Sequence, residues 1–231
     1  LDRDLCGAKT GRNGRHPLPD REAFAARVGS WGIGPATQVV TYDAQGGSYA
    51  ARAWWMFRWL GHEAVAVLDG GLAAWQAAGG AVTTAPPEER PAVRYMPSGN
   101  PMPTVDAGHV QAGLARPGEL IVLDARSGER YRGEAEPIDP VAGRIPGSRH
   151  RFFKDNLDGV GRFKPPAALR EEFIALGLGG TPGQVAHACG SGVTACVNLL
   201  AMAHAGLEGT ALYPGSWSEW CADPARPVAR G

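Results

Sequence analysis

One cysteine lies in a stretch whose residue types suit nucleophilic chemistry. Residues 187–201 read HACGSGVTACVNLLA, in which Cys189 is followed by small residues and then by a helical pattern. A residue between a buried strand and a helix N-terminus lies where open α/β sheets bind ligands. Backbone N–H groups of a curled loop and the helix dipole favour the thiolate, which is the nucleophilic form. We therefore predict that Cys189 is a reactive cysteine.

The loop after this cysteine is expected to surround the sulfur with amides. Gly190 and Gly192 tolerate the positive φ values that a curled backbone needs. The alternative is that Cys189 is a small core residue beside a tight turn, as many free cysteines are. Under the first interpretation, the loop residues expected to contact the substrate are Gly190, Gly192, Val193 and Thr194.

An internal repeat indicates how the chain positions this loop. Residues 38–75 and 184–220 each contain a short apolar run, a glycine-rich turn, a helical stretch, a second apolar run and Gly-x-x-x-x-Trp. Apolar runs that alternate with helical patterns predict parallel strands with crossover helices. We expect an α/β protein of two tandem domains, each with a central, mostly parallel sheet flanked by helices. Asp43 takes the place of Cys189 in the first copy, so that copy is predicted to be non-catalytic.

The repeat also predicts the domain boundaries. We expect an N-terminal domain over residues 1–80, a proline-rich linker over 81–103 and a catalytic domain over 104–231. The second copy begins with the strand-like run ELIVLDARSGERY, which has no counterpart in the first. By this register we expect a first strand to be missing before Leu1.

Composition excludes several classes of partner. The chain has 23 basic and 23 acidic residues, so no charge pattern for nucleic acid or an anionic membrane is present. No apolar run approaches the roughly 20 residues that span a bilayer. Its four cysteines form no CxxC pair and no zinc-like spacing with histidines, so neither a metal site nor a disulfide framework is expected. We expect a reducing, cytoplasmic location.

Four stretches together resemble the tandem-domain rhodanese family of sulfurtransferases. They are CGSGVTAC, LDARSGERYRGEAEP, GRIPGS and VLDGGLAAW, and the resemblance covers essentially the whole chain. The CGSGVT loop is similar to that of the 3-mercaptopyruvate sulfurtransferases. The resemblance implies that Cys189 takes a sulfane sulfur from a small anionic donor, 3-mercaptopyruvate or thiosulfate, and becomes a persulfide. Cyanide, a thiol or thioredoxin would then accept the sulfur, with no metal or organic cofactor.

The resemblance also assigns donor-binding residues. Arg130 matches the arginine that pairs with the donor's carboxylate or sulfonate-like oxygens, for which a guanidinium fork is suited. Arg132 would share its face if this segment were extended. Ile138 stands where mercaptopyruvate enzymes usually carry a second arginine, and Arg144 is a candidate to compensate for it. This departure leaves a thiosulfate-preferring enzyme as an alternative.

A Ser–His–Asp relay beside the cysteine is the last feature that the resemblance implies. Ser191 matches its serine, His16 its histidine and Asp4 its aspartate. A Ser–His pair can polarise the donor carbonyl while the sulfur leaves. The alternatives are a histidine packed in a turn and a serine bonded to its own loop.

Rival functions use the same nucleophile differently. A cysteine phosphatase needs an arginine at the end of the loop, where this chain has Ala195. A Cys–His hydrolase would pair Cys189 with His16, but no substrate groove is indicated. A sulfur carrier or regulatory module without small-molecule turnover stays open.

Cys196 is predicted to be a packing residue, Cys6 and Cys221 receive no role, and Trp217 is a candidate wall of the pocket.

Overall fold

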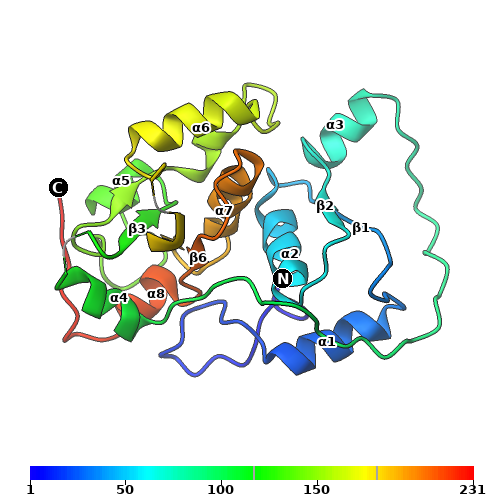
Figure 1. Cartoon of the computed structure of the whole chain (residues 1–231), viewed down its shortest axis with the longest axis horizontal. Helices are drawn as coiled ribbons and strands as arrows, with labels where there is room; N and C mark the ends of the chain where they lie inside the picture. The colour runs from blue at the N-terminus through cyan, green and yellow to red at the C-terminus, as the bar shows by residue number, and fades with distance from the viewer. Residues whose placement is uncertain (117, 181) are drawn as a thin grey trace.

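The fold was analysed in a computed structural model that describes residues 1–116, 118–180 and 182–231. Two parallel sheets lie side by side along the long axis of the molecule, each with helices around it (Figure 1). The α/β class expected from the repeat is confirmed, and the two sheets are consistent with two rhodanese-like domains.

The N-terminal sheet has two parallel strands, β1 (Val39–Thr41) and β2 (Val65–Val67). The helix α2 (Ser48–Trp59) crosses between them and begins after Gly47, whose φ of 82° suits glycine. The Asp20 carboxylate caps α1 (Arg21–Ser30) by accepting from the Ala23 amide. The helix α3 (Gly71–Ala77) follows β2.

The C-terminal sheet has four parallel strands in the order β4-β3-β5-β6. The expected central strand is β5, and all four of its residues are buried. This pattern is typical of a parallel strand covered on both faces. The strands are β3 (Ile121–Asp124), β4 (Arg149–His150), β5 (Val185–Ala188) and β6 (Ala211–Leu212); the helices are α4 (Ala107–Leu114), α5 (Gly128–Arg132), α6 (Pro166–Ala175), α7 (Ala195–His204) and α8 (Ser216–Trp220), with 3₁₀ turns η1 (Phe153–Asn156) and η2 (Pro182–Gln184).

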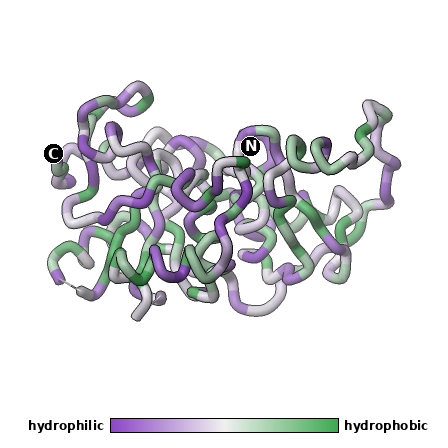
Figure 2. Tube along the Cα trace, turned by 90° about the horizontal axis from the view of Figure 1, so that it is seen from above, coloured by the Kyte–Doolittle hydropathy of each residue, from purple (hydrophilic) through white to green (hydrophobic). Residues whose placement is uncertain are grey.

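The two halves share one apolar core. Helices α2 and α7 pack side by side between the sheets (Figure 1). Trp55 and Met56 of α2 belong to the same buried cluster as Cys196 and Leu199 of α7. Figure 2 shows hydrophobic and hydrophilic stretches alternating along the chain in both halves. Because burial of apolar area is the main favourable contribution to folding, this contact fixes the halves relative to each other.

The segment between the halves, residues 81–103, contains no helix or strand. It is nevertheless fixed to the N-terminal half along part of its length. The Val93 amide donates to the Gly29 carbonyl (2.9 Å), and the Ser98 amide donates to the Leu60 carbonyl (3.0 Å). Tyr95 is buried. This expected linker is therefore packed onto α1 and α2 before it returns to α4 (Figure 1).

Candidate active site

The Cys189 sulfur lies at the carboxyl end of β5, directly before the loop that leads into α7. The amides of Ser191 and Gly192 donate to Sγ over 3.4 and 3.1 Å. In the described structure these two amides are the ones in the loop that bond to the sulfur. The other amides of residues 190–194 do not donate to it. Gly192 has a φ of 75°, and a Cβ there would lie 2.4 Å from the Pro214 carbonyl oxygen, so the turn requires glycine. Two aligned N–H dipoles favour a negative charge on sulfur.

Ser216 holds the backbone of Cys189 from behind. Its hydroxyl accepts a hydrogen bond from the Cys189 amide (3.0 Å) and donates to the Tyr213 carbonyl (2.9 Å). Ser216 is fully buried and is the one non-glycine residue with a positive φ, 51°, in the described ranges. This strained residue and the bond from the Trp217 amide to the Cys189 carbonyl (2.9 Å) fix the cysteine's position.

Ser191 and His16 lie in contact, as the family resemblance implied. The Nδ1 atom of His16 lies 2.7 Å from Ser191 Oγ, across 175 residues of chain. Burial lowers the pKa of His16 below the usual range, so the ring is neutral at pH 7. The pair lies beside Cys189, and all three residues line one cavity.

The predicted third member of the relay is placed elsewhere. The Asp4 carboxylate accepts from Arg27 Nε (2.7 Å) on α1 instead of reaching His16. The nearer carboxylate is that of Asp2, whose Oδ1 lies 3.8 Å from His16 Nε2. Asp4 is drawn away because the α1 guanidinium offers it two N–H donors. The pairing expected for Asp4 is therefore corrected to a peripheral contact of His16 with Asp2.

Arg130 points toward the cysteine loop, whereas Arg132 does not. Both lie on α5, and residues two apart on a helix face different directions. The expectation of a shared face assumed an extended segment and is corrected. Arg132 is half exposed and pairs with Glu134 (2.6 Å), while Arg130 lines the cavity with Cys189.

Buried carboxylates hold Arg130 in place. Its guanidinium donates to Glu136 (2.7 Å) and to Asp139 (3.2 Å), whose side chains are each 3% exposed. Burial opposes ionisation of Glu136, but the hydrogen bonds from Arg130 and nearby amides outweigh it and lower its pKa. Arg126 lies behind this group, bonded to Asp124 and stacked on Trp217 at 4.8 Å.

The cavity that contains Cys189 has a volume of about 440 Å³. Ile138 and Tyr49 lie at its edge, and both are exposed apolar side chains. Trp217, the candidate wall, is instead buried, and its indole N–H donates to the Val141 carbonyl (2.9 Å). The full lining is Leu1, Asp2, Arg15, His16, Gln45, Ser48, Tyr49, Arg130, Ile138, Cys189, Gly190, Ser191, Val193 and Thr194.

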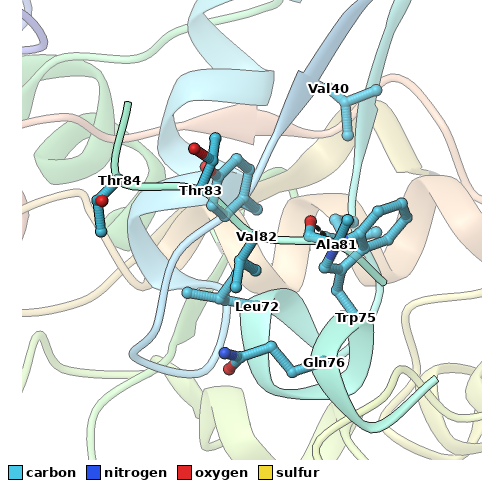
Figure 3. Close-up of a pocket in the computed structure, with 10 residues that line it drawn as sticks. Val40, Leu72, Trp75, Gln76, Ala81, Val82, Thr83 and Thr84 are labelled. Carbon is cyan, nitrogen blue, oxygen red and sulfur yellow. Dashed lines mark hydrogen bonds between the residues drawn. The ribbon is translucent and has the colours of Figure 1, made fainter. Parts of the chain in front are cut away.

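A larger cavity of about 970 Å³ lies in the N-terminal half (Figure 3). Leu72, Val82 and Trp75 face it, and the Trp75 indole N–H donates to the Ala81 carbonyl (2.9 Å). None of the predicted site residues lines it. Its walls are mainly apolar and include no cysteine, histidine or charged side chain, so the smaller cavity is the candidate active site.

Arg52 of α2 links the N-terminal half to the cysteine loop. Its fully buried guanidinium donates to the Gly192 carbonyl (3.0 Å) and the His16 carbonyl (3.2 Å). One side chain therefore holds both the loop around the sulfur and the segment that carries the histidine. An unpaired buried carbonyl costs about 1–3 kcal/mol, so these bonds stabilise the site's geometry.

The remaining cysteines differ from Cys189. Cys196 is fully buried in α7, and burial raises the pKa of its thiol to about 12, as expected for a packing residue. Burial also raises the pKa of Cys6 and Cys221. All four thiols are free. Among the described residues, no group of three or more His, Cys, Asp or Glu side chains is arranged to hold a metal ion.

Several site residues carry no clear signal in the sequence. Ser216 lies within GSWSEW, where a serine reads as an ordinary turn residue, and Arg52 reads as a helix-surface cation. Arg15 stands directly before His16, and this position next to a predicted site residue was the one signal in the sequence that Arg15 lines the cavity. Arg144 was a candidate for the cavity, but it stacks on Tyr131 at 4.8 Å and does not line the cavity.

Comparison with known proteins identifies the family of this arrangement. A family model described as a rhodanese-like domain matches residues 5–78. The chain is 50% identical over its full length to a Pseudomonas aeruginosa protein named "Probable 3-mercaptopyruvate sulfurtransferase", covering 81% of it. It is 37% identical to the human 3-mercaptopyruvate sulfurtransferase over 95% of this chain and 74% of that protein.

A solved structure agrees with these relatives in fold. The 3-mercaptopyruvate sulfurtransferase from Leishmania major superposes with a TM-score of 0.81 at 29% identity. The match covers 95% of this chain, which spans 61% of the length of that protein.

In the described ranges no helix has the length and apolar character needed to cross a membrane.

Proposed function

We propose a persulfide mechanism for this chain, which belongs to the rhodanese family of sulfurtransferases. It is a sulfurtransferase of the 3-mercaptopyruvate/thiosulfate type. We assign the nucleophile to Cys189 and the preferred donor to 3-mercaptopyruvate. The observation that carries this assignment is the sulfur at the end of β5, which accepts two amide hydrogen bonds in a cavity shared with Arg130 and His16.

The first half-reaction loads sulfur onto the cysteine. The Cys189 thiolate attacks the sulfur of 3-mercaptopyruvate, forming an S–S bond as the donor's C–S bond breaks. The electron pair of that bond passes into the enolate of pyruvate, which then takes a proton. The amides of Ser191 and Gly192 stabilise negative charge on the cysteine sulfur before the attack.

Ser191 and Arg130 bind the carbonyl oxygen and the carboxylate of the donor. With the proton on His16 Nδ1, the imidazole donates to Ser191 Oγ, and the serine hydroxyl is free to donate to the developing enolate oxygen. Arg130 binds the donor's carboxylate. In the second half-reaction, cyanide, a small thiol or thioredoxin attacks the outer sulfur and releases the Cys189 thiolate. These steps need no metal or organic cofactor.

We further propose that catalysis belongs to a domain over residues 104–231, with residues 1–80 as a non-catalytic domain and 81–103 as the linker. The N-terminal half supplies His16 and the Arg52 bonds to the cysteine loop. A reducing, cytoplasmic location fits four free thiols, because the proposed cycle needs a cysteine that is not in a disulfide.

Kinetics with two donors tests this function. We expect kcat/KM with cyanide as acceptor to be higher for 3-mercaptopyruvate than for thiosulfate. Cys189→Ser should reduce turnover of both donors to background, while Cys196→Ala, a packing control, should retain activity. Activity in Cys189→Ser would contradict the mechanism, and a preference for thiosulfate would overturn the donor assignment. Persulfide formation without turnover would indicate a sulfur carrier.

A further inference from the structure

One buried guanidinium beside the cysteine loop has no carboxylate partner. Arg52 of α2 is fully buried, and in the part of the chain that the structure describes no Asp or Glu side chain forms an ion pair with it. Its hydrogen bonds go to the backbone carbonyl oxygens of Leu5 (3.4 Å), His16 (3.2 Å) and Gly192 (3.0 Å), and its Nε atom has no partner among the described residues. Carbonyl groups carry no net charge, and a buried charge without an opposite charge nearby is costly.

The other arginines that are buried or that line the cavity all have carboxylate partners. Arg151 pairs with Glu172. The remaining three form one chain of ion pairs with three carboxylates, and the charges of this chain sum to zero. Its members are Arg15, Asp139, Arg130, Glu136, Arg126 and Asp124. Arg52 is therefore the one buried arginine in the described ranges whose charge no fixed anion balances.

Gly192 connects this charge to the nucleophile. Its carbonyl accepts from Arg52 Nη1 (3.0 Å) and its amide donates to Cys189 Sγ (3.1 Å), so one residue separates the guanidinium from the sulfur. The charge of Arg52 also acts on two titratable groups near the loop. Burial raises the pKa of the Cys196 thiol, and the Arg52 charge opposes that rise. Burial lowers the pKa of His16, and the Arg52 charge adds to that effect.

We infer that the Cys189 thiolate is the counter-charge of Arg52, so that the N-terminal half supplies the positive charge that stabilises the nucleophile of the C-terminal half. This inference rests on the proposed function, in which the thiolate attacks the donor, and deepens it. With a neutral thiol the Arg52 guanidinium has no anion beside it, whereas with a thiolate the two charges sum to zero. Arg52 does not line the cavity, so it is a positioning residue that acts on the sulfur through its charge and through Gly192.

The first experiment measures the alkylation of Cys189 by iodoacetamide in the full chain, at pH 7 and at pH 9.5. Iodoacetamide is uncharged and reacts with the thiolate, and peptide masses distinguish Cys189 from the other cysteines. Arg52→Gln keeps N–H donors and removes the charge, whereas Arg52→Lys keeps the charge. We expect Arg52→Gln to slow the reaction at least about tenfold at pH 7 and less than about threefold at pH 9.5. Arg52→Lys should stay within about threefold of wild type at both pH values.

A control on the same helix and a second pair of variants separate charge from packing. Arg58 lies one turn and a half later on α2, is partly exposed and does not line the cavity, so the rate in Arg58→Gln should stay within about twofold of wild type. Cys189→Asp and Cys189→Asn differ in charge and little in shape, and urea unfolding compares their stability. We expect a higher urea midpoint for Cys189→Asp, because its carboxylate takes the place of the thiolate beside Arg52. Adding Arg52→Gln should reduce the difference between the two midpoints by at least about half.

The outcomes distinguish a charge partner of the sulfur from a packing residue. Equal slowing in Arg52→Gln and Arg52→Lys, no slowing in Arg52→Gln, or an Asp–Asn difference that does not depend on Arg52 would show that Arg52 only supports the loop and that the inference is wrong. If Arg52→Gln does not fold, Arg52→Lys decides: a rate at pH 7 within about threefold of wild type supports the inference, and a greater loss overturns it. If wild type forms no persulfide with either donor, the proposed function fails, whereas alkylation and unfolding still test the charge pair.

Discussion

Asp43 and Cys189 occupy equivalent positions in the two copies of the repeat. Asp43 lies two residues after β1, and Cys189 lies one residue after β5. Both side chains accept hydrogen bonds from backbone amides. The Asp43 carboxylate accepts from the amides of Gln45, Gly47, Tyr49 and Ala50 over 2.8–2.9 Å. The first copy thus fills its nest of amides with an aspartate side chain, which has no sulfur to act as a nucleophile. The second copy has a sulfur in that place. The two loops therefore both bind an acceptor with backbone amides, a structural carboxylate at Asp43 and the proposed reactive sulfur at Cys189.

At the residue scale, Ser191→Ala tests the role given to the serine. We expect kcat for 3-mercaptopyruvate to fall roughly 10- to 100-fold, because a hydrogen bond to the developing enolate oxygen is lost. Thiosulfate has no carbonyl group, so its turnover should change less than about threefold. The measurement is steady-state kinetics with both donors on one preparation. Equal losses for both donors would show that Ser191 supports the loop and not the enolate.

At the scale of elements, the sequence predicted the strand, loop and helix that hold Cys189. Three apolar residues and a histidine before a glycine-containing loop and a small-residue helix sufficed to predict β5 and α7. The arginine segment was harder, because GERYR is too short for a periodic pattern to distinguish α5 from a strand. That ambiguity explains why Arg132 was expected to share a face with Arg130, whereas the helix α5 turns the two side chains in different directions.

The strand β5 also carries a histidine that should make stability depend on pH. His187 is fully buried, and neither ring nitrogen has a hydrogen-bond partner among the described residues. Burial lowers its pKa from 6.5 to about 3. The unfolded chain therefore binds the proton more readily than the folded one. The resulting stability is fully present above pH 6.5 and is lost as the pH falls from 6.5 toward about 3.

We therefore predict that His187→Leu reduces acid sensitivity. Between pH 7 and about pH 4.5 the free energy of unfolding should fall in both proteins. The fall should be about 2–3 kcal/mol smaller in the His187→Leu variant than in wild type, because each pH unit contributes up to about 1.4 kcal/mol. Urea titrations at both pH values measure this. His204→Gln, at an exposed position, is the control and should follow wild type. Parallel pH profiles for wild type and His187→Leu would show that burial of His187 does not set this dependence.

At the scale of the whole molecule, the site depends on how the two halves pack together. The core shared by α2 and α7 brings the N-terminal segment to the cysteine loop, and Arg52 bonds to both. The family resemblance predicted that Ser191 and His16 would meet. It did not predict the meeting of Arg15 with Asp139, or of Asp4 with Arg27. Such pairings follow from the docking of distant segments, which local patterns and propensities do not encode.

The most direct test of the central claim is a single loading reaction without acceptor. Wild-type protein is mixed with excess 3-mercaptopyruvate, and the pyruvate released and the mass of the intact chain and its peptides are measured. We predict one equivalent of pyruvate per chain and a gain of one sulfur atom on the peptide that contains Cys189, both absent in Cys189→Ser. A sulfur atom on Cys6, Cys196 or Cys221, or pyruvate release without any persulfide, would contradict the account.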